Sequence, residues 1–413
     1  MTLQADPHAP SRRAFLRRTG LTLSAGAVLS VLDAGPHAAA AAADPDELFK
    51  AGRLTAAERG YRRLLRADPS NTHALAQVGY LALLSNRFGE AEQHLSKALD
   101  LQPGDVASAQ RLAECFVRQD RLTRALPLLK GIDRPREQAF AELYPHIGGT
   151  PWQIRGPRST HVPFVTLDPV PAVEASLNGG EPQRFWLDTY ATLDLSKEVA
   201  EQAGLRAVTT MSGGVANNQP ITIWLGVLDS FKIGNIEIRN LPVQWSDARR
   251  PSMPDGTPAA GAFGTTIFYH FLTTMDYAGR ALILRRKTKA GQRQNAAGRL
   301  PLWLAGDHYP CTVGSLGDHG PRMVTLDTGG IASGLDTTVE IAEKAGGIQV
   351  DYDHPIEQPG GNKLYPITAE RISLGRAGGR DVRGHAAEQV FPGFPGPGQS
   401  AQFGFDLIAN FTH

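Results

Sequence analysis

An apolar run that ends in an aspartate occurs twice along the chain. In the first, Phe-Trp-Leu leads into Asp188 and Thr189, and in the second, Met-Val-Thr-Leu leads into Asp327 and Thr328. A short apolar run bounded by turn residues predicts a buried strand. Each strand would deliver one carboxylate, with a hydroxyl beside it, into a tight turn. If the two turns face each other, the sequence predicts a pair of carboxylates.

The surroundings of the two runs also match. Gly264 follows Asp188 at almost the same separation as Gly404 follows Asp327, and an apolar residue precedes each glycine. Two pairs of predicted elements lie between these landmarks: short helices stopped by glycine at 196–204 and 338–346, and glycine-bearing hairpins at 211–218 and 358–362. These matches indicate an internal duplication of a β-rich unit.

The duplicated unit resembles the aspartic protease superfamily, and within it the bacterial retropepsin-like proteins, whose units carry Asp-Thr-Gly and an apolar-apolar-Gly turn. The second copy fits this pattern closely, with Leu-Asp-Thr-Gly-Gly at 326–330 and Phe-Gly-Phe-Asp-Leu at 403–407. In the first copy, Phe-Gly at 263–264 is followed by residues 271–277, which are similar to the closing strand of the family. The resemblance runs from near Val162 to the C-terminus and implies an all-β, two-lobed unit.

This resemblance implies an aspartic endopeptidase that acts on peptides or proteins without a cofactor, with Asp188 and Asp327 as its catalytic pair. Two carboxylates about 3 Å apart cannot both ionise, so one pKa rises and the other falls, as in aspartic proteases as a class. The pair then holds one proton and titrates as a unit. Its ionised member takes a proton from attacking water, while its protonated member donates to the developing oxyanion.

Further residues have roles implied by the same resemblance. Thr189 and Thr328 would tie the two turns together through hydroxyl hydrogen bonds. Gly329 would give the second turn an unhindered backbone. The two hairpins would be flaps over a substrate cleft, with glycines at Gly213, Gly214, Gly360 and Gly361.

Tyr190 departs from the family pattern, because glycine is expected after the threonine of the first turn. Its side chain would fill part of the cleft or displace Asp188 from hydrogen-bonding reach. Two functions therefore stay open. One is an active endopeptidase, and the other is a non-catalytic peptide-binding or scaffolding protein of the same fold.

The region from residue 46 to residue 132 has a different, helical pattern. Arg53, Arg87 and Arg121 recur at a spacing of about 34 residues, and small residues recur at the same spacing. Pro69 and Pro103 close two of the units. The pattern resembles tetratricopeptide repeats, in which stacked helix pairs form a concave surface that binds a partner. The array would bind substrate or a protein partner, or else pack on the protease-like unit or mediate self-assembly.

The N-terminus, residues 1–43, resembles a twin-arginine signal peptide. Arg12 and Arg13 precede an apolar stretch from Leu21 to Leu32, and a run of small residues follows. The stretch is shorter than the about 20 residues that a membrane-spanning helix needs. We expect a periplasmic or secreted protein, with a membrane contact only if the signal segment is uncleaved.

The expected fold class is a multidomain α + β chain, in which an N-terminal α-helical repeat array precedes the all-β, two-lobed unit. A net charge of +1 gives no argument for nucleic acid, and neither His-Glu-x-x-His nor Cys-x-x-Cys spacing for zinc occurs. Cys115 and Cys311 are expected to be separate buried thiols. The expected boundaries place a linker at 133–160 with one helix near 137–143, the first lobe at 161–286, an interlobe linker at 287–299 and the second lobe at 300–413.

Overall fold

The computed structural model describes residues 43–216, 219–248, 250–288, 299–330, 333–358, 361–389, 396, 399–404 and 408. The expected signal peptide therefore lies outside the described residues, apart from Ala43. So does most of the expected interlobe linker. None of the helices in the described ranges is long and apolar enough to cross a membrane.

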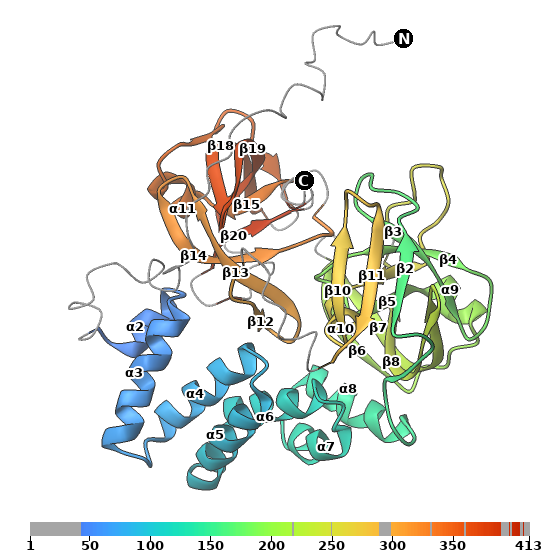
Figure 1. Ribbon diagram of the computed structural model, residues 1–413, viewed down its shortest axis with the longest axis horizontal. Helices are drawn as coiled ribbons and strands as arrows, with labels where there is room; N and C mark the ends of the chain where they lie inside the picture. Colours follow the sequence, from blue (N-terminus) through green and yellow to red (C-terminus); the bar gives the residue numbers. More distant parts are fainter. Residues whose placement is uncertain are drawn as a thin grey trace, which may run out of the picture. The chain divides into compact units, whose positions relative to one another are not determined.

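The first part of the described chain is a series of helices, as predicted (Figure 1). They are α2 (Pro45–Lys50), α3 (Leu54–Ala67), α4 (Thr72–Leu84), α5 (Phe88–Leu101), α6 (Val106–Val117), α7 (Leu122–Lys130) and α8 (Pro135–Leu143). The three recurring arginines, Arg53, Arg87 and Arg121, each stand immediately before the second helix of a pair. The first helix is capped by Asn71 in one repeat and by Asp105 in the next, whose side chains accept backbone N–H bonds.

Small residues let the paired helices touch. A Cβ added at Gly79 of α4 would lie 2.6 Å from Cγ of Leu95 in α5, so only glycine permits this approach. The first repeat is shortened, because its first helix α2 spans six residues. The periodicity in the sequence thus follows from helix packing.

The segment expected to be a linker, residues 133–160, contains more structure than that. Helix α8 adds Ala139, Ala141 and Leu143 to the apolar core of the array. A 3₁₀ turn η1 (Tyr144–His146) follows, and strand β1 (Gln153–Arg155) pairs with a strand of the first lobe. The helix near 137–143 was visible in the sequence, but the β1 pairing depends on a strand distant along the chain.

The first lobe is built from strands with two short helices. Its elements are β2 (Ser159–Pro163), β3 (Ala172–Leu177), β4 (Gln183–Leu187), β5 (Leu193–Ser196), α9 (Lys197–Gln202), β6 (Thr209–Ala216), β7 (Gln219–Ile233), β8 (Ile236–Ser246), β9 (Gly261–Phe263), α10 (Thr265–Phe268), β10 (Phe271–Asp276) and β11 (Ala281–Arg286). Strands β10, β11 and β2 form a separate three-stranded sheet.

The second lobe repeats this plan. Its elements are β12 (Trp303–Ala305), β13 (Tyr309–Leu316), β14 (His319–Leu326), β15 (Leu335–Thr338), α11 (Val339–Lys344), β16 (Ile348–Val350), β17 (Ile356–Glu357), β18 (Lys363–Leu374), β19 (Ala377–Ala387) and β20 (Gln399–Phe403). Helices α9 and α11, both predicted, start at Ser196 and Thr338, whose hydroxyls accept an N–H bond from the first turn.

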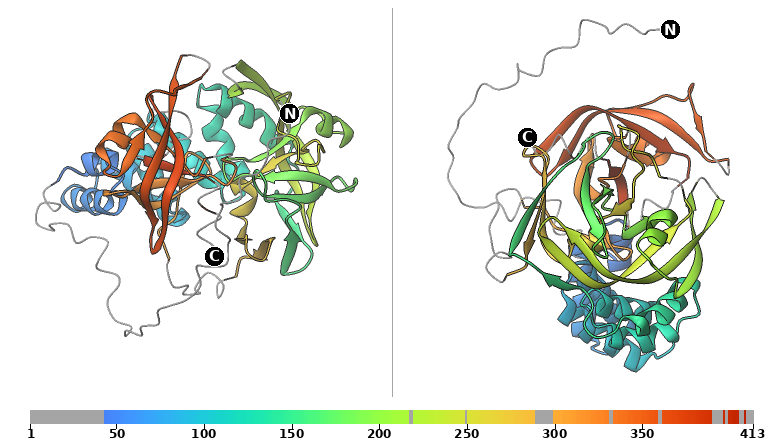
Figure 2. Two further views of the ribbon diagram at one scale, coloured as in Figure 1. Left: turned by 90° about the horizontal axis from the view of Figure 1, so that it is seen from above. Right: turned by 90° about the vertical axis from the view of Figure 1, so that its right-hand side faces the viewer.

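The two lobes have the same strand order, which establishes the duplication in three dimensions. The first lobe runs β8-β5-β9-β4-β3-β7 and closes through the pairing of β7 with β8, and the second runs β19-β15-β20-β14-β13-β18 and closes through β18 with β19. Each lobe is therefore a closed six-stranded barrel. Figure 2 shows the curved strands of both lobes from two further directions. The predicted fold class is confirmed.

Buried apolar side chains fill each barrel beneath the strands that end in the aspartates. In the first lobe, Phe185 and Phe231 meet edge to face with ring centroids 5.5 Å apart, and Phe263 packs on Phe231 in the same way at 5.3 Å. In the second lobe, Val324 and Phe403 lie in the corresponding core. This packing fixes β4 and β14, the two strands that lead into Asp188 and Asp327.

The helical array shares apolar cores with both lobes. Leu225 of β7 is buried in one cluster with the helices α4 to α8. Trp303, Cys311 and Met323 of the second lobe are buried in another cluster with α2, α3 and α4. Of the alternatives for the array, packing on the two-lobed unit is the one that these contacts support. Cys115 and Cys311 are both free and buried.

Candidate active site

Asp188 and Asp327 meet at the ends of equivalent strands. Asp188 follows β4 and Asp327 follows β14, and their carboxyl groups hydrogen-bond to each other. Asp327 is buried, at 7% exposure, and Asp188 is half-buried. The structure therefore brings together the two carboxylates that the sequence singled out.

The backbone around each aspartate is arranged in the same way. The amide of Tyr190 donates to Oδ1 of Asp188 at 2.7 Å, and the amide of Gly329 donates to Oδ1 of Asp327 at 2.9 Å. The amides of the aspartates themselves donate to the carbonyls of Phe263 and Phe403. Each carboxylate thus has one oxygen held by its own turn.

The glycines of the apolar-apolar-Gly motif are explained by the same turns. A Cβ at Gly264 would lie 1.7 Å from the carbonyl oxygen of Asp188, and a Cβ at Gly404 would lie 1.9 Å from that of Ser333. Neither approach leaves room for a side chain. The repeated glycine therefore allows the end of β9 to pass close to the Asp188 turn and the end of β20 to pass close to Ser333, which lies between the Asp327 turn and β15.

Thr189 and Thr328 join the two turns reciprocally. The amide of Thr189 donates to Oγ1 of Thr328 at 3.0 Å, and the amide of Thr328 donates to Oγ1 of Thr189 at 3.1 Å. Each hydroxyl in turn donates across the lobe boundary, that of Thr189 to the carbonyl of Leu326 and that of Thr328 to the carbonyl of Leu187. Four hydrogen bonds thus fix one aspartate turn against the other.

Tyr190 keeps Asp188 in place, because its backbone amide donates to Asp188 as the amide of Gly329 donates to Asp327. Its hydroxyl donates to Oγ1 of Thr325, and its ring meets that of Tyr309 edge to face at 4.6 Å. The side chain is thus anchored on the second lobe. In the second turn, a Cβ at Gly329 would lie 2.4 Å from Cγ of Asp188, so glycine is required there. The two turns are therefore not interchangeable.

Burial and mutual repulsion set the charge of the pair. Burial raises the pKa of Asp188, against the hydrogen bond from the Tyr190 amide, and the nearby Asp194 raises it further. Burial also raises the pKa of Asp327 well above its usual range, and the charge of Asp188 adds to this. The arrangement favours one shared proton, held mainly on Asp327.

Gln402 makes the pair asymmetric, and sequence reasoning missed it. Its Nε2 donates to Oδ2 of Asp327, while its own Oε1 is buried without a partner among the described residues. The matched position of the first lobe holds Ala262, which offers no donor. This difference, one residue before the apolar residue of the repeated motif, is the signal that could have revealed Gln402.

Two further carboxylates, which the sequence analysis did not predict, lie near the first pair. Asp194 and Asp336 occupy matching positions of β5 and β15, and each raises the pKa of the nearer member of the pair. Asp194 accepts bonds from Thr192, and Asp336 accepts a bond from Ser333 at 2.9 Å. The number of residues between Asp188 and Asp194 differs from the number between Asp327 and Asp336. The match was therefore not visible in the sequence.

The two hairpins exist as elements, but their role as flaps stays a prediction. Strands β6 and β7 form the first, and Gly213 and Gly214 lie at a register shift in β6. Strands β17 and β18 form the second, where Gly361 has a φ of +81° that favours glycine. Gly360 lies outside the described residues.

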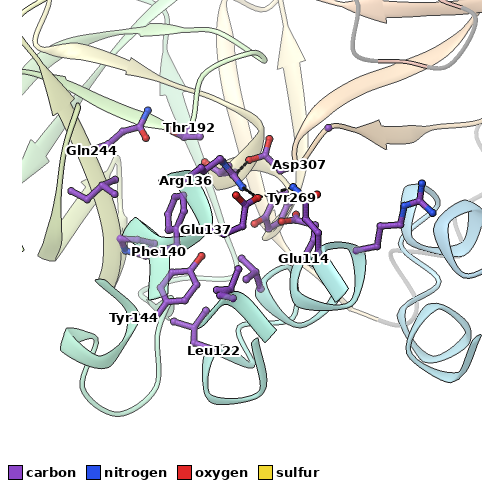
Figure 3. A pocket seen from close by; sticks show the side chains of 18 of the residues that line it. Glu114, Leu122, Arg136, Glu137, Phe140, Tyr144, Thr192, Gln244, Tyr269 and Asp307 are labelled. Atoms are coloured by element: carbon purple, nitrogen blue, oxygen red, sulfur yellow. Dashed lines mark hydrogen bonds and ion pairs between the residues drawn. The ribbon is translucent and has the colours of Figure 1, made fainter. Parts of the chain in front are cut away.

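The described residues contain no cluster of three or more His, Cys, Asp or Glu side chains that could hold a metal ion. A cavity of about 500 Å³ lies elsewhere, between the helices α4, α6 and α8 and the lobes (Figure 3). Neither Asp188 nor Asp327 lines it. Its wall includes Glu114, Arg136 and Asp307.

Comparisons with known proteins agree with this arrangement. Residues 173–267, which contain Asp188 and Gly264, match the family model described as aspartyl protease. Residues 46–106 and 82–144 match two models described as tetratricopeptide repeat, and the second match includes α8. A search of proteins with curated functions gave no match. An aspartyl-protease-like domain thus follows N-terminal tetratricopeptide-like repeats.

Two solved structures show limited similarity. A retropepsin-like aspartic protease from Rickettsia conorii is 18% identical, with 33% of this chain and 98% of that chain covered and a TM-score of 0.25. A mutant of the Thermobaculum terrenum O-GlcNAc transferase is 24% identical, with 25% of this chain and 21% of that chain covered and a TM-score of 0.23. The chain thus spans about a fifth of that transferase.

Proposed function

We propose that the protein is an aspartic endopeptidase that hydrolyses peptide bonds in peptide or protein substrates. One observation carries this proposal: two carboxyl groups, at the ends of equivalent strands in two matching barrels, hydrogen-bond to each other. The threonine bonds between the turns hold that contact in place. The aspartyl protease match to the first barrel supports the same function.

In the proposed reaction the two carboxyls do opposite jobs. Asp188, the ionised member, takes a proton from a water molecule that attacks the peptide carbonyl carbon. Asp327, which holds the shared proton, donates it to the carbonyl oxygen as the tetrahedral intermediate forms. The intermediate then collapses as Asp327 takes a proton back from one of its two hydroxyl groups, the C–N bond breaks, and the leaving amine receives the proton that Asp188 accepted. Each carboxyl returns to its starting state at the end of the cycle.

The alternative, a peptide-binding protein without catalysis, depended on Tyr190, which would either fill part of the cleft or cause displacement of Asp188. The geometry of the turn argues against that displacement, because the Tyr190 amide holds Asp188 at 2.7 Å and its ring is anchored on the second lobe. The catalytic function is therefore the better supported of the two.

Cleavage of a mixed peptide library across acid to neutral pH tests the proposal. We expect cleavage favoured at acid pH, blocked by a statine-type transition-state analogue, and lost in both Asp188→Asn and Asp327→Asn. Asp353→Asn, at an exposed turn, is the matched control and should retain activity. Library peptides that bind but are never cleaved by the folded protein would instead establish the binding function.

We also propose export by the twin-arginine route, which would make the protein periplasmic or secreted. The support is the Arg12 and Arg13 pair before an apolar stretch. Fractionation of producing cells should find the protein outside the cytoplasm, and the double change Arg12→Lys and Arg13→Lys should retain it inside. Equal export of both forms would contradict this route.

For the helical array, the tetratricopeptide matches suggest protein interactions. Its helices α4, α6 and α8 face the lobes across the cavity, so we propose that an external partner uses a different face of the array. Binding of a candidate partner should survive substitutions in the cavity wall. Competition between a partner and the lobes for that wall would contradict this proposal.

A further inference from the structure

The turn between β12 and β13 contacts the helical array on one side. The guanidinium of Arg118 donates to the carbonyls of Leu304 and Gly306 at 3.3 and 3.4 Å. Arg136 of α8 forms an ion pair with Asp307 of the same turn. Arg136 and Asp307 point toward one another at the wall of the cavity in Figure 3. Two arginines of the array therefore hold this turn.

The same turn contacts the candidate dyad on its other side. His308 is buried, at 5% exposure, and its Nε2 lies 2.7 Å from the carbonyl oxygen of Tyr190. Its Nδ1 bonds to Oδ1 of Asp307. Tyr190 is the residue whose amide holds Asp188. A continuous set of contacts thus runs from Arg136 through Asp307 and His308 to the turn of Asp188.

The two bonds of His308 require a particular protonation state. A carbonyl and a carboxylate only accept hydrogen bonds, so both ring nitrogens must donate and the ring must carry two protons. A neutral ring would keep one of the two bonds and lose the other. The geometry therefore holds a buried imidazolium beside the dyad turn.

The charges around His308 agree with that state. Burial lowers the pKa of His308, but the carboxylate of Asp307 outweighs it and leaves the pKa raised, with the more distant Asp194 acting in the same direction. Burial raises the pKa of Asp307, but Arg136, His308 and Arg118 together hold it well below its usual range. The Tyr309 ring stacks on the imidazole, with centroids 4.4 Å apart.

We propose that His308 is a positioning residue for Asp188, and that Arg136 of the helical array keeps it in place through Asp307. Fixing the Tyr190 carbonyl fixes the peptide whose amide orients the Asp188 carboxylate. The array thereby acts on the dyad without touching substrate. This proposal rests on the proposed endopeptidase function, and it gives the array an intramolecular role.

The pH dependence has a definite sign. Because the folded pKa of His308 is raised, the bond to Tyr190 is fully present below the pKa of an unfolded histidine. As pH rises through the folded pKa, the neutral ring keeps its proton on Nδ1, which faces the Asp307 carboxylate, and the bond to Tyr190 is lost. Peptidase activity should therefore decline on the alkaline side partly through His308, separately from titration of the two aspartates.

Substitutions that separate hydrogen bonding from charge test the proposal. His308→Gln can place an amide N–H where Nε2 stands, so kcat should stay close to that of the native protein and lose its dependence on His308 titration. His308→Leu should lower kcat by about ten- to a hundred-fold with KM little changed, because a misplaced catalytic group costs that much. The matched controls are His354→Gln and His354→Leu, at an exposed histidine that also pairs with an aspartate, Asp351.

Amide hydrogen exchange in residues 187–193 gives a readout that needs no activity. We expect faster exchange in His308→Leu and in Arg136→Ala than in the native protein, and unchanged exchange in His354→Leu. Faster exchange in a protein that cleaves no peptide would support the positioning role and reject the endopeptidase function. Unchanged exchange in both variants, with folding confirmed by circular dichroism, would overturn the positioning role whatever the activity.

Discussion

At the scale of single residues, the dyad is asymmetric although the barrels around it match. Asp327 accepts a bond from Gln402, whereas Asp188 has Ala262 at the corresponding place. A hydrogen bond donated to a carboxylate stabilises its ionised form and lowers its pKa. Gln402 therefore opposes the burial that raises the pKa of Asp327, and keeps the shared proton available for transfer.

Replacing Gln402 tests this opposition. In Gln402→Ala the donor is removed, so the pKa of Asp327 should rise and the alkaline limb of the pH profile for kcat/KM should move to higher pH. The alkaline limb marks the loss of the proton on Asp327 that is donated to the carbonyl oxygen. The measurement is the pH dependence of cleavage of one peptide substrate.

The control for this change is Gln349→Ala, at an exposed glutamine of β16 in the same lobe. It should leave the alkaline limb where it is. A limb that moves to lower pH in Gln402→Ala would show that Gln402 accepts a hydrogen bond from protonated Asp327 instead of donating one. A limb that does not move would show that Gln402 has no effect on the pKa of Asp327.

Site residues could be predicted from the sequence only where both copies of the duplicated pattern contain them. Asp188, Asp327 and the two threonines stand in both copies of one pattern, so a single sequence was enough to pair them. Gln402 has no counterpart, and its role depends on its distance to Asp327. His308 lies far from Tyr190 along the chain, and only the folded arrangement brings them together.

At the scale of elements, the ends of β4 and β14 are tied by the threonine bonds. Thr328 is buried at 4% exposure, and its hydroxyl takes part in two of the four bonds: it accepts from the amide of Thr189 and donates to the carbonyl of Leu187. Valine has the same shape without the hydroxyl. A buried polar group that loses its partner costs about 1 to 3 kcal/mol.

Thr328→Val should therefore lower the free energy of unfolding by about 1 to 3 kcal/mol. It should also reduce kcat, because the two aspartate turns are no longer held together. Denaturant unfolding and steady-state kinetics measure the two effects.

Thr337→Val provides a matched comparison within one lobe. Thr337 is fully buried in β15, and its hydroxyl donates to the carbonyl of Ser400 in β20. We expect a similar loss of stability with kcat retained, because this bond does not join the two turns. Equal losses of kcat in both variants would show that the threonine bonds support the fold in general and not the dyad contact.

The elements also show which features local sequence patterns can predict and which they cannot. The helices α9 and α11 were predicted because their sequences match in type and glycine follows the end of each, and the structure adds a hydroxyl cap at the start of each. The segment 133–160 was expected to be a linker because prolines and glycines break its periodicity. Strand β1 in that segment is three residues long and owes its conformation to pairing with β8, which no local pattern records.

At the scale of the whole described molecule, the array and the lobes share their cores. Leu225 of the first lobe and Trp303, Cys311 and Met323 of the second are buried among helices. If the array and the lobes separated, these shared apolar side chains would be exposed to water, which is unfavourable. We infer that residues from 43 onward fold cooperatively.

This inference predicts one unfolding transition with two probes. All five tryptophans, at positions 152, 186, 224, 245 and 303, lie outside the repeats, so their fluorescence reports the lobes. Far-ultraviolet circular dichroism is dominated by the helices of the array. Both signals should change at the same temperature, and Leu95→Ala in the core of the array should lower both midpoints together. A fully buried leucine cut to alanine costs about 2 to 5 kcal/mol.

The control for Leu95→Ala is Leu101→Ala, at a leucine of the same helix α5 that is 48% exposed, where little stability should be lost. If Leu95→Ala lowered only the dichroism midpoint and left the fluorescence midpoint unchanged, the array would be an independent domain. Melting of the array would then release Arg136 from Asp307 while the lobes stayed folded. Coincident midpoints instead require that damage to a repeat remote from Asp188 destabilises the lobes that hold it.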